Sequence, residues 1–378
     1  MERGALEALA QLREERGEFE PLFKTLGTLA DMAETGAARG AIQRRMARIA
    51  EDRLDRKDDA LALWDEVSAS DPSDVEALRE LQRLRRERGE WSAFVDACEQ
   101  EIRLEGGAED RILSLLREVG RVAETKLEDA GMAQEAWRRV LAIARGDREA
   151  LESLRRLYQE TGDLEALSGV LTQLYDSPLL GDDERRAVCL DHARLLTDDL
   201  GRPEQAIDRW NLLLDAEPTH AEALTSLDRL YEDTGRHADC VAIIRRRADL
   251  VEGEARAGLL ARAAEIQNGP LGDPAAAART LETVAEIQPG NADVSEELQM
   301  LYRRLEDWDR LANVLLRRDD FLADDTDARI QNLADLARVY ETRKGEPAAA
   351  FYLWRKALQI LPGDGMAAVE QGRAAQDQ

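Results

Sequence analysis

Two cysteines and two histidines are the residues of this sequence whose types and spacing could bind a metal. Cys189 and His192 stand three residues apart, and His237 and Cys240 repeat that spacing further along the chain. Because residues three apart share one side of a helix, the four side chains could form a zinc site. The matching positions of the chain's internal repeat, however, hold Leu116, Val119, Trp91 and Phe94. We therefore interpret the four as core residues, since buried cysteine behaves as a small hydrophobe, and predict no metal and no cofactor.

The remaining sequence lacks the patterns that catalysis requires. It has no phosphate-binding loop, no dinucleotide glycine fingerprint, no His-Glu-x2-His and no Cys-x2-Cys. Acidic residues are abundant, but pairs of carboxylates are expected on any charged helical face and do not indicate acid–base chemistry. We therefore predict that these 378 residues are not an enzyme.

A column of arginines is the second candidate site. The chain contains an internal repeat, described below, that consists of two half-units. In one half-unit the arginine directly follows a recurring small residue in the first helix, and in the other it stands at the equivalent position. Only Glu265 and Met300 replace arginine at these positions. Planar guanidinium groups in a row suit an acidic peptide, a C-terminal carboxylate or an acidic protein surface. The column consists of Arg48, Arg83, Arg121, Arg156, Arg194, Arg229 and Arg338.

The same arginines have a simpler interpretation. Acidic residues lie three or four positions after most of them, so each arginine could pair along its own helix, for about 0.2–0.5 kcal/mol. The column would then be a solvated, internally neutralised face. The acidic residues are Glu51, Glu87, Glu124, Glu160, Asp233 and Glu341.

The elements that would position these residues follow from an internal repeat. Tryptophan recurs at one position, with Leu281 in its place in the fourth of five copies, at spacings of 73, 73, 71 and 73 residues. A small residue stands four positions earlier, and a turn glycine separates the two halves in most copies, with Glu306 as the departure. The other members of the column are Trp64, Trp137, Trp210 and Trp354.

Each copy contains four amphipathic helices. In the third copy, apolar residues at three- and four-residue steps predict helices over 184–198, 204–216, 220–233 and 237–250. No stretch alternates with a period of two, so we predict an all-α fold without a sheet. Because a lone helical hairpin cannot bury its apolar face, the hairpins must stack, and the six tryptophans are expected in the core.

The half-unit pattern resembles the tetratricopeptide repeat (TPR). Leu224, Leu227, Tyr231 and Gly235, followed by Cys240, fall on that family's consensus positions. So do Ala206, Trp210 and Pro218 of the preceding hairpin. The resemblance implies one α-solenoid over residues 1–378, a right-handed superhelix of about ten antiparallel helix pairs plus a terminal helix, whose first helices line a concave groove. We place double-hairpin units at 41–109, 110–182, 183–254 and 255–327, with partial units at 1–40 and 328–378.

Composition narrows the partners. The net charge of −26 disfavours nucleic acid and anionic membranes. The chain has no apolar run of membrane-spanning length and no N-terminal hydrophobic segment. Its three separate cysteines, Cys98, Cys189 and Cys240, fit a reducing compartment. We therefore expect a cytoplasmic protein, and the excess of arginine over lysine suggests a bacterial coding sequence.

These observations predict a scaffold or adaptor that binds a partner protein or acidic peptide in its groove, without catalysis. Two alternatives stay open. The chain could assemble with copies of itself into a ring, filament or dimer through packing faces at its ends. It could also be a regulatory or recognition segment of a larger bacterial protein.

Overall fold

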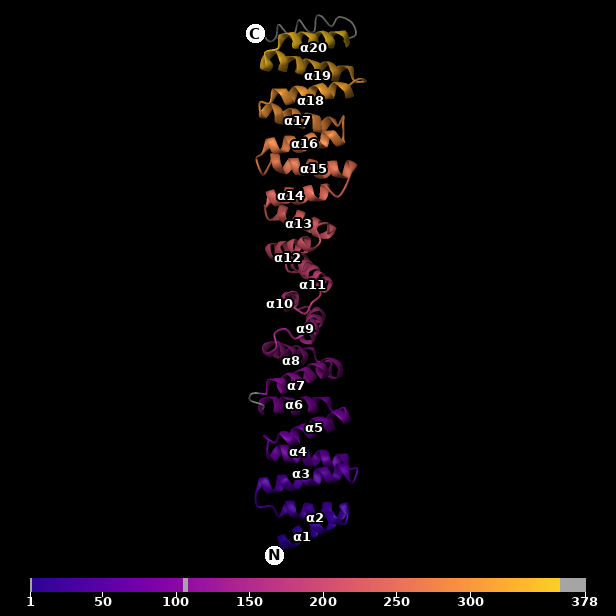
Figure 1. Cartoon of the computed structure of the whole chain (residues 1–378), viewed down its shortest axis with the longest axis vertical. Coiled ribbons are helices and arrows are strands. Elements are labelled where there is room, and N and C mark those ends of the chain that lie inside the picture. Colours follow the sequence, from indigo (N-terminus) through magenta and orange to yellow (C-terminus); the bar gives the residue numbers. More distant parts are fainter. Residues whose placement is uncertain (1, 105–107, 361–378) are drawn as a thin grey trace. The chain divides into compact units, whose positions relative to one another are not determined.

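The computed structural model describes residues 2–104 and 108–360. The packing divides the chain into two compact units, Met1–Val188 and Cys189–Gln378, each of which is considered by itself. Within each unit, helices joined by short turns follow one another in chain order, and neighbours pack as antiparallel pairs (Figure 1). No residue in the described ranges belongs to a strand, which confirms the prediction of an all-α fold.

The helices alternate between two roles. We call the odd-numbered helices A helices and the even-numbered ones B helices, as numbered in Figure 1. The first unit contains α1 (Glu2–Glu15), α2 (Phe19–Asp31), α3 (Gly36–Asp52), α4 (Lys57–Ser70), α5 (Val75–Arg88), α6 (Trp91–Leu104), α7 (Glu109–Val122), α8 (Ala130–Ile143), α9 (Arg148–Thr161) and α10 (Leu164–Tyr175), and α11 (Asp182–Arg194) runs into the second.

The second unit continues the same alternation of A and B helices. None of the helices in residues 2–104 and 108–360 has both the length and the apolar character needed to cross a bilayer. The remaining helices are α12 (Pro203–Ala216), α13 (Ala221–Asp233), α14 (His237–Ala248), α15 (Gly253–Asn268), α16 (Pro274–Ile287), α17 (Ala292–Arg304), α18 (Trp308–Phe321), α19 (Thr326–Arg338) and α20 (Pro347–Ile360).

The predicted elements of the third copy are confirmed with small shifts of their ends. The first predicted helix is not α-helical throughout, because α11 continues beyond Arg194 as a π-helical segment, η2 (Leu195–Asp199). Similar segments, η1 (Ala123–Leu127) and η3 (Val339–Lys344), extend α7 and α19. The ten described helix pairs agree with the expected number. The expected terminal helix lies outside the described residues, and the 73-residue unit boundaries stay a prediction.

Two kinds of helix ending explain why the half-units differ in length. The short A helices end in a left-handed residue and a backbone bond spanning five residues, as from Asp163 N–H to the Tyr158 carbonyl. The long A helices end in a wider turn, in which the N–H of Asp129 bonds to the carbonyl of Ala123, six residues back. The same wider bond recurs in all five long A helices. The extra residues of the longer half-unit are therefore part of a regular wide turn.

Glu306 adopts the same backbone conformation as the glycines that it replaces. Its φ is 56°, and those of Gly89, Gly162 and Gly235 are 73°, 73° and 70°. The departure from glycine in the fourth copy therefore leaves the turn intact, although a residue with a Cβ is strained there.

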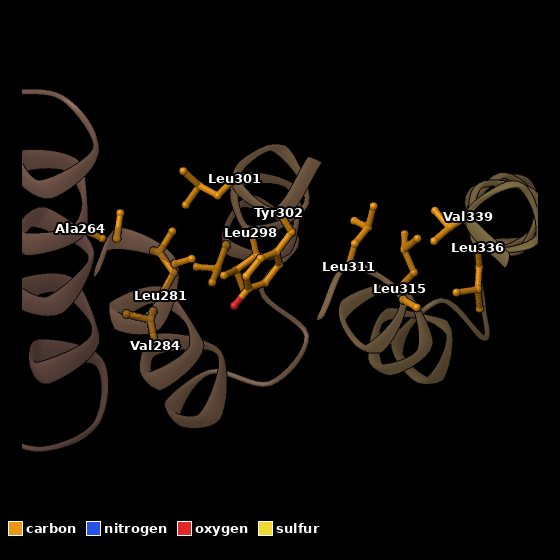
Figure 2. Close-up of a cluster of buried hydrophobic side chains, with 14 of the residues drawn as sticks. Ala264, Leu281, Val284, Leu298, Leu301, Tyr302, Leu311, Leu315, Leu336 and Val339 are labelled. Atoms are coloured by element: carbon orange, nitrogen blue, oxygen red, sulfur yellow. The ribbon is translucent and has the colours of Figure 1, made fainter. Parts of the chain in front are cut away.

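The core lies between the A and B helices of each unit. Trp64, Trp137 and Trp210 are fully buried, as expected. Their counterpart Trp354 is only partly buried, as are Trp91 and Trp308 at the other recurring position. In the second unit one cluster joins α15 to α20, with Leu281 at the tryptophan position and Tyr302 among leucines (Figure 2). The same residue types recur in each copy because each hairpin packs against the next one through the same positions.

Candidate functional site

The seven arginines of the column all lie on A helices. On the long helices each follows a buried small residue, as Arg48 follows Ala47 and Arg194 follows Ala193, and the arginine therefore points away from the core. All seven side chains are at least 42 % exposed. The arginines of the column are therefore accessible to solvent in each unit, and their role in binding stays a prediction.

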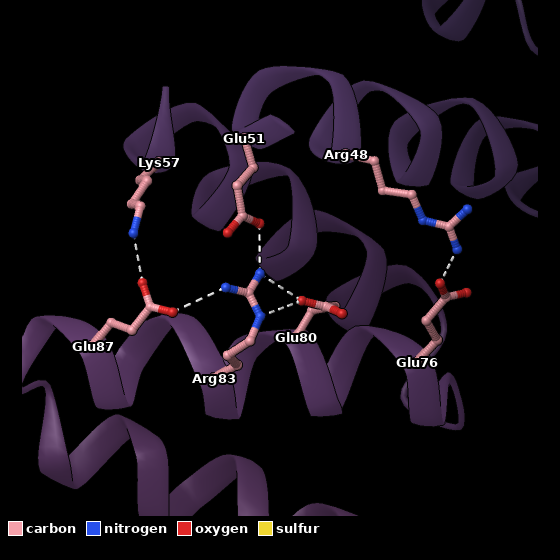
Figure 3. Close-up of polar contacts among 7 residues, drawn as sticks. All are labelled: Arg48, Glu51, Lys57, Glu76, Glu80, Arg83 and Glu87. Atoms are coloured by element: carbon pink, nitrogen blue, oxygen red, sulfur yellow. Dashed lines mark hydrogen bonds and ion pairs between the residues drawn. The ribbon is translucent and has the colours of Figure 1, made fainter. Parts of the chain in front are cut away.

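In the first unit these arginines connect successive A helices. Arg48 on α3 pairs with Glu76 on α5, and Arg83 on α5 returns to Glu51 on α3 at 2.5 Å (Figure 3). Arg83 also contacts Glu80 at 2.7 Å and Glu87 at 3.1 Å on its own helix. Two reciprocal ion pairs therefore join α3 to α5.

The next two A helices repeat this arrangement. Arg121 on α7 donates from both Nε and Nη2 to Glu149 on α9, at 2.5 and 2.6 Å. Arg156 on α9 returns to Glu124 on α7. Hydrogen bonding to Glu149 raises the pKa of Arg121, so the guanidinium stays charged.

In the second unit the arrangement fades along the chain. Arg194 on α11 keeps the two-point contact, with Glu222 on α13 at 2.7 and 2.6 Å. Arg229 instead approaches Asp233 on its own helix at 3.9 Å, and Arg338 contacts Asp335 at 3.1 Å. The two positions without arginine lie between Arg229 and Arg338, at Glu265 on α15 and Met300 on α17.

Pairing along single helices, the simpler interpretation, is correct for Arg83 with Glu87 and for Arg229 with Asp233. It is wrong for Glu51 and Glu124, which bind the arginine of the next A helix. The reason is geometric, because successive A helices lie side by side and a long arginine reaches across as easily as along. Glu341, the expected partner of Arg338, accepts a bond from the Trp354 indole at 3.5 Å.

A basic cleft lies between α5 and α7, next to Arg83. It has a volume of about 620 Å³, and four guanidinium groups line it, from Arg79, Arg83, Arg86 and Arg111. Two carboxylates also line it, those of the exposed Glu87 and the partly buried Glu118. The lining is therefore rich in arginine, although the whole chain is strongly acidic.

A buried carboxylate that the sequence did not reveal fixes this cleft. Glu101 on α6 is fully buried and accepts bonds from Arg79 at 2.8 Å, Arg111 at 2.9 Å and Gln82 at 2.7 Å. Burial alone would raise the pKa of Glu101, but these bonds outweigh it and lower the pKa. The signal in the sequence was a charged residue at a position that holds Leu174 one copy later.

The cysteine and histidine quartet is not assembled. The Cys189 thiol bonds to the Arg209 carbonyl at 3.2 Å, and the Cys240 thiol contacts Asp228 at 3.4 Å. Burial, followed by that contact, raises the pKa of Cys240 to about 12. Burial, with Arg209 second, lowers the pKa of His192 to about 4. Across the residues that the structure describes, no three His, Cys, Asp or Glu side chains are grouped as metal ligands.

These features define the class of the protein. It consists of antiparallel helix pairs that follow one another in chain order and carry ion pairs between A helices, and the predicted all-α fold of stacked helix pairs is confirmed within each unit. No family model and no curated protein sequence matches the chain.

Several solved structures are similar to the chain, and the likeness concerns the fold alone. Naa15/Naa10 bound to HypK-THB is 13 % identical, with a TM-score of 0.35 over 93 % of this chain and 68 % of that one. A tetratricopeptide repeat protein from Parabacteroides merdae is 12 % identical, with a TM-score of 0.29 over 79 % and 98 %. YrrB, a TPR protein with an unusual peptide-binding site, is 18 % identical, with a TM-score of 0.29 over 49 % and 90 %.

Proposed function

We propose that the chain is a non-catalytic scaffold that binds a partner protein or acidic peptide through its A-helix arginines. The cleft between α5 and α7 carries this proposal, because four guanidinium groups line it and only two carboxylates, those of Glu87 and Glu118, share the lining. Arginine presents several donors in a fixed plane, so an incoming carboxylate finds a matching surface. The binding residues are Arg48, Arg83, Arg121, Arg156, Arg194, Arg229 and Arg338.

The existing ion pairs do not prevent such binding. Where both partners are exposed, as in Arg121 with Glu149 and Arg194 with Glu222, an ion pair contributes about 0–1 kcal/mol, so a partner's carboxylate can replace the internal glutamate at small cost. The two-point contact of Arg121 with Glu149 supports the proposal, because the guanidinium is already held in the geometry that binds a carboxylate. Such preorganisation lowers the entropic cost of binding.

Affinity capture with the intact chain tests the proposal. We expect the triple variant Arg83→Glu, Arg121→Glu and Arg156→Glu to lose the partners that the wild-type chain retains, with its helical circular dichroism unchanged. Raised salt should release those partners from the wild type, since the contacts are electrostatic.

The matched control changes the same charge on B helices. Arg103, Arg279 and Arg355 are exposed, and the structure gives them no ion pair with another described residue. The variant Arg103→Glu, Arg279→Glu and Arg355→Glu should retain the partners. If both triple variants capture the same proteins as the wild type, the A-helix face is not the binding surface.

A further inference from the structure

A second kind of cleft lies on the B helices, at the same place of the repeat in three copies. The cleft between α4 and α6 includes Asp65 and Arg85, and the one between α16 and α18 includes Glu282. The corresponding cleft between α8 and α10 includes Arg138 and Tyr158 and is the largest, with about 720 Å³. The repeat therefore allows the same site to be compared between copies.

In the first, third and fourth copies, a side-chain hydrogen bond joins the B helix to the following A helix at this position. Arg85 donates to Asp65 at 2.5 Å, and the Tyr302 hydroxyl donates to Glu282 at 2.5 Å. In the third copy, Asn211 and the Tyr231 hydroxyl bond at 2.9 Å. Each tie brings together a donor and an acceptor.

The cleft between α8 and α10 holds two donors at these positions. The counterparts of the tied residues are Arg138 and Tyr158, and the part of the chain that the structure describes provides no partner for the Tyr158 hydroxyl. Tyr158 is only 5 % exposed, but its hydroxyl is not among the buried polar atoms that lack a partner, so the oxygen is reached by water in the cleft. Burial raises the pKa of Tyr158, and the hydroxyl therefore keeps its proton at neutral pH. What this position lacks is an acceptor.

A second side-chain bond, present in the first and third copies, is missing between the described residues of this copy and of the fourth, where Arg317 stands at the same position. In the first copy Gln100 bonds to the Pro72 carbonyl at 3.0 Å, and in the third Arg246 bonds to the Pro218 carbonyl at 3.0 Å. The counterpart here, Gln173, makes no such bond to the residues that are described. Gly169 in the wall leaves open space where a Cβ would stand. No side-chain hydrogen bond of these two kinds therefore closes the cleft among the described residues, and we call it the unlatched cleft.

We propose that the cleft between α8 and α10 binds an acidic side chain of a partner peptide. Tyr158 and Arg138 donate to its carboxylate, and Leu141 and Val170, which line the same cleft, contact a neighbouring apolar side chain. Arg138 is exposed and held by Glu135 of its own helix at 3.2 Å, so its guanidinium can turn to the ligand. Arg145 also lines the cleft, so its charged lining consists of two arginines and one carboxylate, that of Asp176.

This site differs from the arginine column on the A helices. On α9, Tyr158 lines the cleft, whereas Arg156, two residues earlier, lies on the opposite side of the helix. The proposal therefore adds a second binding surface and does not depend on the first.

Fluorescence anisotropy of a labelled peptide on the full chain tests the site. The probe is an acetylated hexapeptide of alternating Leu and Glu, and its analogue carries Gln in place of Glu. We expect the acidic probe to bind with a Kd on the order of 10–100 µM, and the Gln analogue at least about tenfold more weakly. Tyr158→Phe, which removes only the hydroxyl, should weaken the acidic probe about tenfold.

Two controls make the outcomes distinct. Tyr231→Phe removes the matched hydroxyl that is tied to Asn211 and should leave the Kd unchanged. The same titrations are made in the A-helix triple variant Arg83→Glu, Arg121→Glu and Arg156→Glu, which removes any binding of the acidic probe to the A-helix arginines. In that background the cleft should retain the acidic probe, and adding Tyr158→Phe should still weaken it about tenfold. The proposal is overturned if Tyr158→Phe leaves the affinity of the triple variant unchanged, if the two probes bind that variant equally, or if it shows no saturable binding up to about 1 mM protein.

Discussion

Gly120 on α7 is the position where a single methyl group should most clearly disturb the fold. Every other copy has alanine there, yet a Cβ on Gly120 would lie 2.6 Å from Cε2 and 2.9 Å from Cδ2 of Trp137. The ring cannot retreat easily, because it is fully buried and its Nε1 donates to Glu124 at 2.8 Å. Overpacking costs about 1–3 kcal/mol, and alanine regains up to about 1 kcal/mol of helix propensity. We expect Gly120→Ala to lower the free energy of unfolding by about 1–2 kcal/mol.

Urea unfolding followed by circular dichroism, together with amide exchange of α7 and α8, measures this effect. Exchange is needed because repeat arrays can unfold in parts, and the local opening of one hairpin is then the relevant quantity. Trp137→Leu, which copies the fourth unit with its Ala264 and Leu281, should remove most of the penalty in the double variant. The predicted clash between a Cβ at position 120 and the Trp137 ring would be refuted by a Gly120→Ala protein that is as stable as wild type. It would also be refuted if the effects of Gly120→Ala and Trp137→Leu on the free energy of unfolding were simply additive in a double-mutant cycle.

Two further predictions concern stability in the second unit. Glu306→Gly should raise the free energy of unfolding by about 1 kcal/mol in urea titrations, because it relieves a left-handed backbone at φ 56°, whereas Gly235→Ala should lower it by a similar amount. For His192, whose folded pKa of about 4 lies below its ordinary 6.5, the unfolded chain binds the proton first as the pH falls. That residue should therefore remove about 2 kcal/mol of stability between pH 7 and pH 5, and His192→Val, the residue found at Val119, should lack this loss while sharing the rest of the pH profile.

The helices and the core could be predicted because they depend on local patterns. Apolar residues at three- and four-residue steps, a turn glycine such as Gly235 and a stop before Pro218 place each helix within a few residues. The π-helical segments could not be predicted in this way, because a turn wider by one residue barely alters the pattern. The only sign of them was the difference between 35- and 38-residue half-units.

The pairing of the arginines could not be predicted, because it depends on distances between helices. From the sequence, Arg156 has Glu160 one turn ahead, but in the structure it binds Glu124 on the preceding A helix. The unlatched cleft needed the same information. Arg138 and Tyr158 are unremarkable until Asp65 and Arg85 show that this position normally holds a donor with an acceptor.

The fourth copy shows what holds successive hairpins together, and this bears on the proposed function. At the positions of the Arg121–Glu149 pair it has Glu265 and Asp293, two like charges, yet α15, α16 and α17 share one buried cluster as elsewhere. Apolar packing is therefore sufficient to stack the helices, and the ion pairs of the other copies contribute little to it. Because these arginines contribute little to the stability of the fold, exchanging an internal glutamate for a partner's carboxylate should cost little free energy.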